Sequence, residues 1–564
     1  MSFSAALCAL NAKYIHSSLA PWCLLAGVKT YAPELCAQVV EGTVNEPEDA
    51  VLGRILALGP DAVTFSCYLW NIRQTLRLAR RVKEALPRTA VVLGGPEVSY
   101  NAGEVLASSP QVDYILSGEG ETSVPALLRC LAAGRTPDAA SVPGLCTREV
   151  LSPPCVLDGP VPSPYGPEYQ KALDGRIAYL ETSRGCPFTC AFCLSGRCGK
   201  PRYFPLEQAF RDILTLANSG AKTVKFIDRT FNANPRHANA ILAFLLEHWG
   251  REIPAGVRFH FEIAGDILRE DTLELLRRMP AGAVQLEIGM QSFCEKTLAA
   301  VRRKTDTEKL KANIRRLTAM GNLHIHIDLI AGLPYEDLTV FEQSFDTGYA
   351  LGADLLQLGF LKLLHGAAMR EEPEAFPCEF SPEPPYEVLR TPWLTPEDLD
   401  VLHAVEDALE RLENSGRFQE TVRYAMEAGG YTPFAFFRAV GLASRRSGLA
   451  DHGVPLDTYT GFLFHELSGW PGVDRDLLRD ALVRDRLASN AAGRLPACLQ
   501  VTDPSLGRAV RRLAQECPPT PGVRRGVALL YGAKQVVFVD YIQKNAVTGR
   551  YLLQVRDIDK LLAK

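Results

Sequence analysis

Three cysteines follow one another at the spacing C-x3-C-x2-C in the segment ETSRGCPFTCAFCLSG: Cys186, Cys190 and Cys193. They come directly after RIAYLETS, a run with the composition of a β-strand. A structural zinc takes four protein ligands, and an electron-transfer iron–sulfur cluster normally takes four cysteines. Three thiolates on one loop would leave one iron of a [4Fe–4S] cluster open. The spacing therefore predicts a cluster that can bind and activate a small molecule.

Alternating strands and helices continue from this loop through residues 176–370. The expected strands are RIAYLETS, TVKFIDRTF, RFHFEIAG, AVQLEIGMQS, LHIHIDLIAGLP and LLQLGFLKLL. These six β/α units are too few for an eight-unit barrel, so they predict an open, partial (β/α)6 barrel. Barrel active sites lie on the loops after the strands, which is where the cysteine loop lies.

The rest of the chain divides into three further regions. Residues 1–140 alternate β-like and helical runs, which predicts a Rossmann-like, doubly wound parallel sheet. Ligands of such sheets bind at the carboxyl ends of the strands. Residues 141–175 are rich in proline and predict a linker, and residues 371–564 predict a mainly helical domain that ends in a β-hairpin over 534–555. The fold class is therefore α/β, with a helical C-terminal domain.

The cysteine spacing, preceded by Arg184-Gly185 and placed after a first strand, resembles the radical S-adenosylmethionine (SAM) superfamily. The resemblance implies that SAM chelates the open iron. One electron, from a reducing system such as flavodoxin, then cleaves SAM to a 5′-deoxyadenosyl radical. An aromatic residue beside the third cysteine is expected, and Phe192 fills that position. Two alternatives stay open: Cys198 as a fourth ligand of a closed site, or three buried cysteines without a metal.

The later strands carry polar residues where the superfamily places contacts to SAM. Asp228, in FIDRTFNAN, falls at the position of groups that contact the methionine part, although the usual Gly-Gly-Glu is absent. The third strand adds Glu262 and Asp266. His324 and His326 alternate on one strand, and we expect interior packing or substrate contacts from them rather than metal ligation. The further SAM contacts that the resemblance implies are Glu287, Gln291, Asp328, Ile330 and Gly332.

The segments VVLGGPEVSY and DYILSGEGETSVPALL resemble the cobalamin-binding domain of cobalamin-dependent radical SAM proteins, and this likeness covers residues 1 to about 365. The Asp-x-His-x-x-Gly element that supplies a histidine to cobalt elsewhere is absent, because His16 lacks that spacing. We therefore expect cobalamin without a protein histidine on cobalt. A domain that only scaffolds the barrel is the alternative. The residues implied for the cobalamin slot are Ser66, Gly94, Gly95, Gly118, Glu119 and Gly120.

The resemblance implies a cobalamin-dependent radical SAM enzyme, most simply a methyltransferase that acts on an unactivated carbon through the 5′-deoxyadenosyl radical. A radical rearrangement, cyclisation or methylthiolation is the first alternative, and a non-catalytic cobalamin carrier or sensor with a structural cluster is the second. A methylthiotransferase should carry a second cysteine cluster near its N-terminus, and the early cysteines lie in separate predicted elements. The C-terminal domain resembles an uncharacterised extension and could cap the barrel mouth.

The composition of the chain limits which binding partners and which cellular compartment we expect. The 564 residues carry a net charge of −4, so no basic excess favours nucleic acid as a partner. No apolar run reaches the roughly 18–20 residues that a membrane span needs. The start of the chain has no charged region ahead of its short apolar stretch, so we expect a strand there rather than a signal peptide. Fifteen scattered cysteines then favour a reducing cytoplasm. The substrate is not specified.

Overall fold

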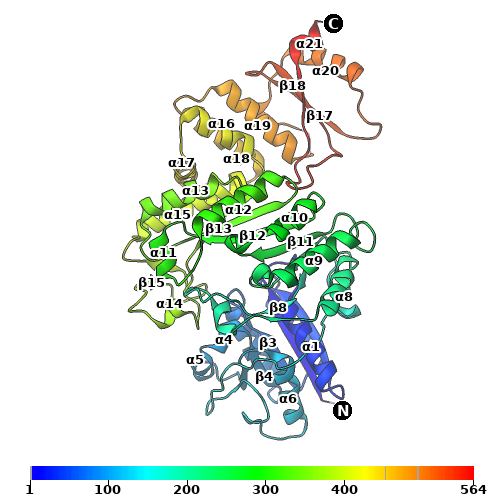
Figure 1. Ribbon diagram of the computed structural model, residues 1–564, viewed down its shortest axis with the longest axis vertical. Coiled ribbons are helices and arrows are strands. Elements are labelled where there is room, and N and C mark those ends of the chain that lie inside the picture. Colours follow the sequence, from blue (N-terminus) through cyan, green and yellow to red (C-terminus); the bar gives the residue numbers. More distant parts are fainter. Residues whose placement is uncertain (1–2, 451, 492–493, 564) are drawn as a thin grey trace. The chain divides into compact units, whose positions relative to one another are not determined.

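The computed structural model describes residues 3–450, 452–491 and 494–563 (Figure 1). The chain forms two compact units. The first comprises Met1–Arg278, Val301–Lys304 and Leu361–Leu389, and the second comprises Met279–Ala300, Thr305–Phe360 and Arg390–Lys564.

The first unit begins with a doubly wound sheet, as predicted. Its strand order is β2-β1-β3-β4-β5-β6, and only β6 runs antiparallel to its neighbour. The strands are β1 (Ser4–Asn11), β2 (Cys36–Thr43), β3 (Ala62–Ser66), β4 (Ala90–Gly94), β5 (Tyr114–Leu116) and β6 (Leu145–Cys146). The order reverses between β1 and β3, and this switch point is where α/β sheets bind ligands.

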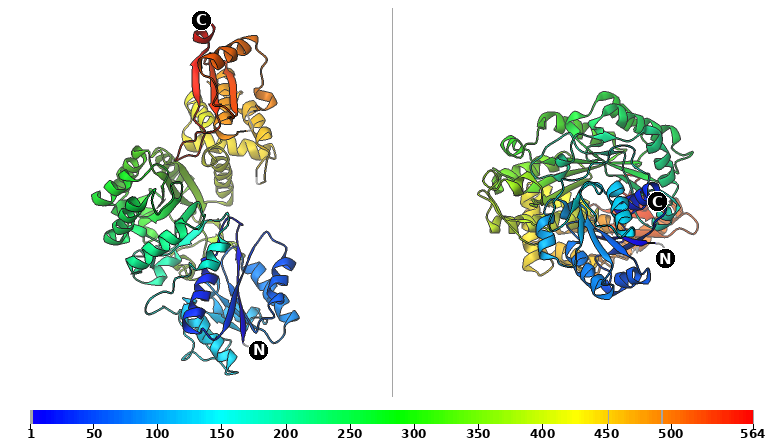
Figure 2. Two further views of the ribbon diagram at one scale, coloured as in Figure 1. Left: turned by 90° about the vertical axis from the view of Figure 1, so that its right-hand side faces the viewer. Right: turned by 90° about the horizontal axis from the view of Figure 1, so that it is seen from below.

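Helices cover both faces of this sheet (Figure 2). Helix α1 packs against α6, and α2 packs against α3. Apolar residues of β1, β3 and β4 form a buried core with residues of α2 and α3. The helices are α1 (Leu19–Tyr31), α2 (Glu48–Ala57), α3 (Ile72–Ala85), α4 (Pro96–Ser99), α5 (Ala102–Ser108) and α6 (Gly120–Ala132).

The predicted linker is largely extended, with one short helix, α7 (Pro167–Ala172). It does not run free of the sheet, because Cys155 forms a parallel bridge with Gly118 beyond the end of β5. Tyr169 is fully buried, and its ring packs edge-on against Trp22. The segment 141–175 therefore lies against the N-terminal sheet and contributes to its ligand-binding end.

Three parallel strands of the partial barrel belong to the first unit, in the order β7-β10-β11. Phe226, Phe259 and Phe261 are fully buried on one face of these strands and contact one another. The elements are β7 (Ala178–Leu180), β8 (Ser183–Arg184), η1 (Leu194–Cys198), β9 (Arg202–Tyr203), α8 (Leu206–Ala217), β10 (Thr223–Phe226), η2 (Phe231–Ala233), α9 (Pro235–His248), β11 (Arg258–Ile263), η3 (Gly265–Ile267), α10 (Glu270–Arg278), α14 (Ala368–Glu371), β15 (Glu379–Phe380) and β16 (Val388–Arg390).

The second unit begins with the remaining three predicted barrel strands, which are parallel in the order β12-β13-β14. All six strands expected from the sequence are therefore present. The elements are β12 (Val284–Gln291), α11 (Glu295–Ala300), α12 (Thr307–Met320), β13 (His324–Ala331), α13 (Leu338–Tyr349) and β14 (Leu355–Phe360).

The C-terminal part of the second unit is mainly helical, as predicted. The hairpin expected over 534–555 is formed by β18 and β19, and a further strand, β17, pairs with β18. The elements are α15 (Pro396–Leu409), the π-helix η4 (Glu410–Asn414), α16 (Gln419–Gly429), α17 (Pro433–Arg446), α18 (Leu456–Leu467), α19 (Arg475–Ser489), η5 (Ala497–Leu499), α20 (Pro504–Glu516), β17 (Arg525–Leu530), β18 (Gln535–Asp540), β19 (Gln554–Asp557) and α21 (Ile558–Leu562).

Strand β14 has an edge that the C-terminal region covers. The side-chain amide of Asn414 donates to the Leu356 carbonyl at 2.8 Å, and its oxygen accepts from the Leu356 amide at 3.2 Å. An uncovered strand edge presents unpaired backbone groups that promote aggregation. Asn414 thus satisfies backbone groups that an open barrel would leave exposed. In the described part of the chain, no helix has the length and apolarity needed to cross a membrane.

Candidate functional site

The cysteine loop is closed at its base by a short hairpin. Strands β8 and β9 are antiparallel, with Arg184 opposite Arg202, and the loop between them contains Cys186, Cys190 and Cys193. Gly185 has a φ of 95°, a conformation that favours glycine, and a Cβ there would lie 2.9 Å from the Gly199 carbonyl oxygen. The sequence Arg-Gly-Cys thus allows the two ends of the loop to approach closely.

The thiols of Cys186, Cys190 and Cys193 are free. Cys190 is buried, whereas Cys186 and Cys193 are partly exposed. The Sγ of Cys193 accepts from the Ser195 amide at 3.4 Å, and Arg303 donates to the Sγ of Cys190 at 3.7 Å. Burial raises the pKa of the Cys190 thiol, and the positive charge of Arg303 opposes this shift. A nearby guanidinium and an amide donor both stabilise negative charge on sulfur.

The donor set fits a cluster better than a single metal ion. Among the residues that the structure describes, no group of three or more His, Cys, Asp or Glu side chains gathers as one metal ion would require. The thiolates of a [4Fe–4S] cluster need not converge on one point, because each binds a different iron. Three soft donors on one short loop are compatible with that requirement. The side chain of Cys198 lies outside the described residues, so the closed four-ligand alternative stays open.

Asp228 lies beside the cysteine loop, and its carboxylate contacts residues at the base of that loop. The carboxylate is buried, and it accepts hydrogen bonds from the Thr182 amide at 3.1 Å and from the Ser183 hydroxyl at 2.5 Å. Burial raises the pKa of Asp228 to about 6, although these hydrogen bonds oppose the shift. In this structure Asp228 therefore anchors the start of the cysteine loop to β10, and its predicted contact with SAM stays a prediction.

Two residues close to Asp228 in the chain, Thr230 and Asn232, also contact neighbouring segments. The Thr230 hydroxyl lies 3.4 Å from the Sγ of Cys186. The side-chain amide of Asn232 bonds both the amide and the carbonyl of Ala264, at 2.9 and 2.8 Å. The segment after β10 thus contacts both the cysteine loop and the end of β11. Phe192 lies within the loop and is partly buried.

The other predicted SAM contacts lie together on β12 and β13 of the second unit. Glu287 is opposite His326, and Gly289 is opposite Asp328, in the parallel register. The pairing is irregular at Gln291, whose φ is 69°. The Nε2 of His326 lies 2.9 Å from Oδ1 of Asp328. Ile330 and Gly332 follow at the carboxyl end of β13, where Gly332 has a φ of 96°.

Glu336 is a residue of this region that the sequence reasoning missed. Its side chain is fully buried, and its Oε1 accepts from Ser292 at 2.7 Å and from Ser344 at 2.9 Å. Burial raises its pKa to about 7. It ties the loop after β12 to the loop after β13. The loop sequence LPYED did not predict that Glu336 is buried, because charged residues usually face solvent.

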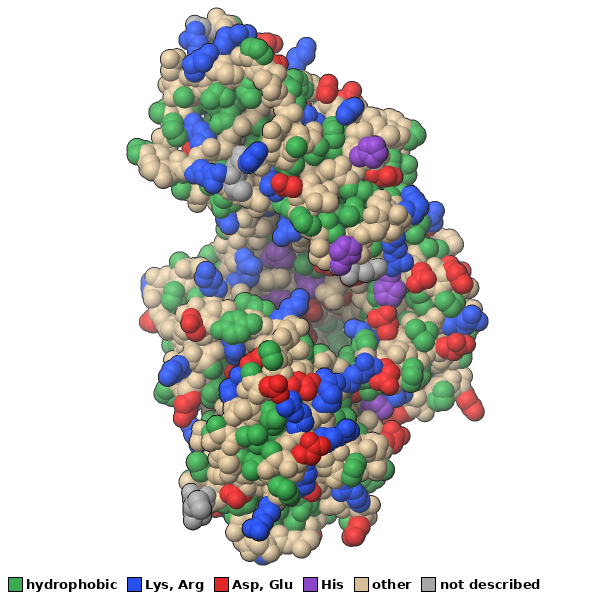
Figure 3. Space-filling model, turned by 180° about the vertical axis from the view of Figure 1, so that it is seen from behind, with side chains coloured by type: hydrophobic (Ala, Val, Ile, Leu, Met, Phe, Trp, Pro, Cys, Tyr) green, Lys and Arg blue, Asp and Glu red, His purple; other side chains and the backbone are tan. Residues whose placement is uncertain are grey.

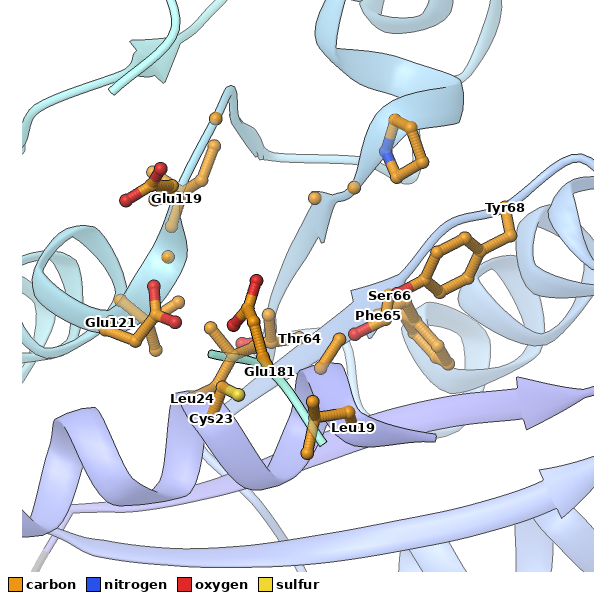
Figure 4. Close-up of a pocket in the computed structure, with 18 of the residues that line it drawn as sticks. Leu19, Cys23, Leu24, Thr64, Phe65, Ser66, Tyr68, Glu119, Glu121 and Glu181 are labelled. Atoms are coloured by element: carbon orange, nitrogen blue, oxygen red, sulfur yellow. The ribbon is translucent and has the colours of Figure 1, made fainter. Parts of the chain in front are cut away.

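A cavity of about 260 Å³ opens at the carboxyl ends of β3, β4 and β5 (Figure 4). Helices α1 and α6 form its other walls. All the residues predicted for the cobalamin slot line it: Ser66, Gly94, Gly95, Gly118, Glu119 and Gly120. One cavity therefore brings these residues together, and their contact with cobalamin stays a prediction.

Two glycines that line this cavity lie where the backbone packs closely on itself. Gly95 and Gly118 have φ values of 103° and 89°, and a Cβ at either would lie within 2.5 Å of a neighbouring carbonyl oxygen. The Oγ1 of Thr64 is buried without a hydrogen-bond partner and belongs to a residue that lines the cavity. A buried polar atom without a partner is costly, so a polar group of a bound ligand or a water would stabilise it here. Thr64 was missed, although it shares the face of Ser66 through the alternation of β3.

A second cavity, of about 310 Å³, joins this slot to the cysteine loop within the first unit. Gly95, Gly118 and Glu119 line both cavities, and Gly185 and Ser195 of the cysteine loop line the second. No histidine is among the described residues that line either cavity. His16 instead lies with its Nδ1 2.7 Å from the Tyr179 hydroxyl. The two predicted cofactor sites therefore border one space.

An ion-pair cluster that includes Glu119, Glu181 and Arg184 lines both cavities. Arg184 contacts Glu119 at 3.1 Å, Glu121 at 2.6 Å and Glu181 at 2.9 Å. Arg202 also pairs with Glu119. Burial acts to raise the pKa of Glu119, but the hydrogen bond from Arg202 and the charge of Arg184 outweigh it and lower the pKa below its ordinary value. The sequence analysis missed Arg202 and Glu121, because each pairs with a residue far away along the chain: Arg202 lies 83 residues from Glu119, and Glu121 lies 63 residues from Arg184.

Three family models match the chain. Residues 180–347 match the radical SAM superfamily, residues 12–128 match the B12 binding domain, and residues 374–517 match a protein of unknown function, DUF4080. Each match falls inside one predicted domain, and the predicted boundaries themselves stay predictions. The chain therefore carries a radical SAM domain, an N-terminal B12-binding domain and a C-terminal DUF4080 domain. The cofactors of these domains are a [4Fe–4S] cluster, SAM and cobalamin.

Two similar proteins are methyltransferases by name. The chain is 30% identical over 342 residues to 2-(S-pantetheinyl)-carbapenam-3-carboxylate methyltransferase of Streptantibioticus cattleyicolor, which covers 56% of this chain and 49% of that protein. It is 28% identical over 306 residues to the cobalamin-dependent radical SAM methyltransferase TokK of Streptomyces tokunonensis, covering 50% and 44%. The chain thus spans about half the length of these relatives.

Two solved structures share the fold. TsrM from Kitasatospora setae, with cobalamin and a [4Fe–4S] cluster bound, has a TM-score of 0.54 at 17% identity, covering 66% of this chain and 74% of that one. The cobalamin-dependent SAM radical enzyme OxsB, with aqua-cobalamin bound, has a TM-score of 0.59 at 14% identity, covering 86% and 79%. These likenesses support the predicted fold class.

Proposed function

We propose that the protein is a cobalamin-dependent radical SAM methyltransferase that acts on an unactivated carbon. The observation that carries this proposal is the cavity lined both by the βα turns of the B12-binding domain and by the cysteine loop. When bound, the cluster supplies the electron that cleaves SAM to a radical, and cobalamin supplies a methyl carrier. Methyl transfer requires both functions to act on one substrate, and a shared space allows this.

The chain's own residues would hold and orient these groups. Cys186, Cys190 and Cys193 would ligate the cluster and leave one iron open. Glu287 and Asp328 are carboxylates that suit the ribose hydroxyls of SAM as acceptors and offset the charge of its sulfonium. The glycines at the ends of β4 and β5 would admit the nucleotide tail of cobalamin. A reducing partner such as flavodoxin and a cytoplasmic location complete the proposal.

Two alternatives are disfavoured by specific observations. A methylthiotransferase would need a second cysteine cluster, but the early cysteines lie apart, on β1, α1, β2 and beyond β3: Cys8, Cys23, Cys36 and Cys67. A nucleic-acid substrate would favour a basic surface. On the face shown in Figure 3, however, Lys and Arg are interspersed with Asp and Glu. The other two alternatives, a radical rearrangement and a cobalamin carrier, are distinguished from the proposal by experiment.

The test of the proposal is the product pattern from SAM. With dithionite or a flavodoxin system, we expect the reconstituted protein to form 5′-deoxyadenosine, and to form S-adenosylhomocysteine only when cobalamin is added. Chromatography with mass detection measures both products. Formation of 5′-deoxyadenosine without S-adenosylhomocysteine would support the rearrangement alternative, and formation of neither would support the carrier.

The coordination of cobalt gives a separate prediction. Because no histidine is among the described residues that line the cavities, paramagnetic resonance of bound cob(II)alamin should show no superhyperfine splitting from a protein nitrogen. A His16→Ala variant should give the same spectrum as the unchanged protein. Clear splitting that disappears in this variant would make His16 a ligand and would contradict its placement beside Tyr179.

A further inference from the structure

Two arginines face each other across the base of the cysteine loop. Arg184 on β8 is directly opposite Arg202 on β9. Like charges directly opposite on neighbouring strands are destabilising. This hairpin has only two residues in each strand, so it has few backbone hydrogen bonds to resist the repulsion. The closure of the loop therefore depends on a negative charge that both arginines share.

Glu119 supplies that charge. Its Oε2 lies 3.1 Å from Nη1 of Arg184, and its Oε1 pairs with Nη2 of Arg202. Glu121 and Glu181 also contact Arg184, but among the described residues neither forms an ion pair with Arg202. Among the described carboxylates, Glu119 is thus the one seen to pair with both stem arginines. Hydrogen bonds between charged partners are stronger than neutral ones, so this bridge is a strong constraint on the loop.

Glu119 is itself held within the cobalamin slot. It precedes α6 as the N-cap residue, its amide donates to the Cys155 carbonyl at 2.9 Å, and its Oε2 accepts from the Leu157 amide at 2.9 Å. Gly118 and Gly120, on either side of it, line the slot. A ligand that enters the slot must therefore contact the backbone segment from which the bridging carboxylate projects.

We propose that Glu119 is a positioning residue that couples the two cofactor sites: its carboxylate holds both stem arginines of the cysteine loop, and its backbone belongs to the cobalamin slot. Occupation of the slot then restricts the loop that carries Cys186, Cys190 and Cys193. Glu119 lines the slot, and through this bridge it links the slot to the cysteine loop. The coupling rests on the proposed role of these cysteines, but its structural part can be tested in the protein without iron.

The test is amide hydrogen exchange of the full chain, without iron, in the presence and absence of hydroxocobalamin. In the unchanged protein, cobalamin should slow exchange in residues 185–201. In Glu119→Gln, which keeps the side-chain shape but removes the charge, exchange in this segment should be about tenfold faster and should no longer respond to cobalamin. Glu34→Gln is the matched control, because Glu34 pairs with Arg129 of α6 at the exposed surface. It should leave the loop unchanged.

A second variant separates coupling from loss of folding. Replacing Arg202 by Gln in the Glu119→Gln background removes the opposed charge, so slow exchange of the loop should return. After reconstitution, Glu119→Gln should also shift the paramagnetic resonance spectrum of the reduced cluster, and the double variant should reverse the shift. Faster exchange throughout the first unit, or unchanged exchange in the loop together with weaker cobalamin binding, would overturn the proposal. Loss of SAM cleavage alone would bear on the proposed function instead.

Discussion

Replacement of Cys186, Cys190 and Cys193 by alanine is expected to lower the iron bound after anaerobic reconstitution from about four atoms per chain to almost none. The reason is that these three thiols are the soft donors of one short loop, closed at its base by β8 and β9. Iron and acid-labile sulfide assays measure the outcome. The paramagnetic resonance signal of the reduced cluster should disappear in parallel.

The matched controls are single cysteine variants outside this set. Cys155→Ala changes a thiol that lines the neighbouring cavity and should leave the iron content unchanged. Cys198→Ala should also keep the full cluster. Equal loss of iron in Cys198→Ala would mean four cysteine ligands, and the argument for an open iron would then fail.

Replacement of Ser66 by phenylalanine is expected to weaken cobalamin binding about 100-fold, which corresponds to about 2.8 kcal/mol. Ser66 is 5% exposed at the end of β3 and lines the cavity of about 260 Å³. A phenyl ring there would project into the cavity and fill space that the nucleotide tail needs. Absorbance titration with hydroxocobalamin measures the affinity.

Ser108→Phe is the matched control, because Ser108 is an exposed residue at the end of α5 in the same domain. It should bind cobalamin as the unchanged protein does, and both variants should show the same thermal unfolding. If Ser66→Phe retained full affinity while folded, cobalamin would have to bind elsewhere, and the assignment of this cavity would be wrong.

The local parts of the site were predictable because short-range chemistry specifies them. The spacing of the three cysteines requires only one loop, and the glycines at 94, 95 and 118 mark tight turns at strand ends, where the structure places them. Strand periodicity located the six barrel strands for the same reason, since alternation of apolar residues reflects one buried face. Asp228 shows the limit of this reasoning, because its position was expected but the direction of its carboxylate was not.

The sequence by itself determined the class of cofactors. Three cysteines at one spacing and glycine-rich βα turns are local features, so their chemistry can be read without knowing the rest of the fold. Only the tertiary structure showed which groups act together. Glu119 lies 83 residues from Arg202, and Glu121 lies 63 residues from Arg184, yet both pairs form ion pairs. No local pattern encodes such contacts, because they arise when separate elements pack. The orphaned hydroxyl of Thr64 likewise became visible only once the walls around it had formed a cavity.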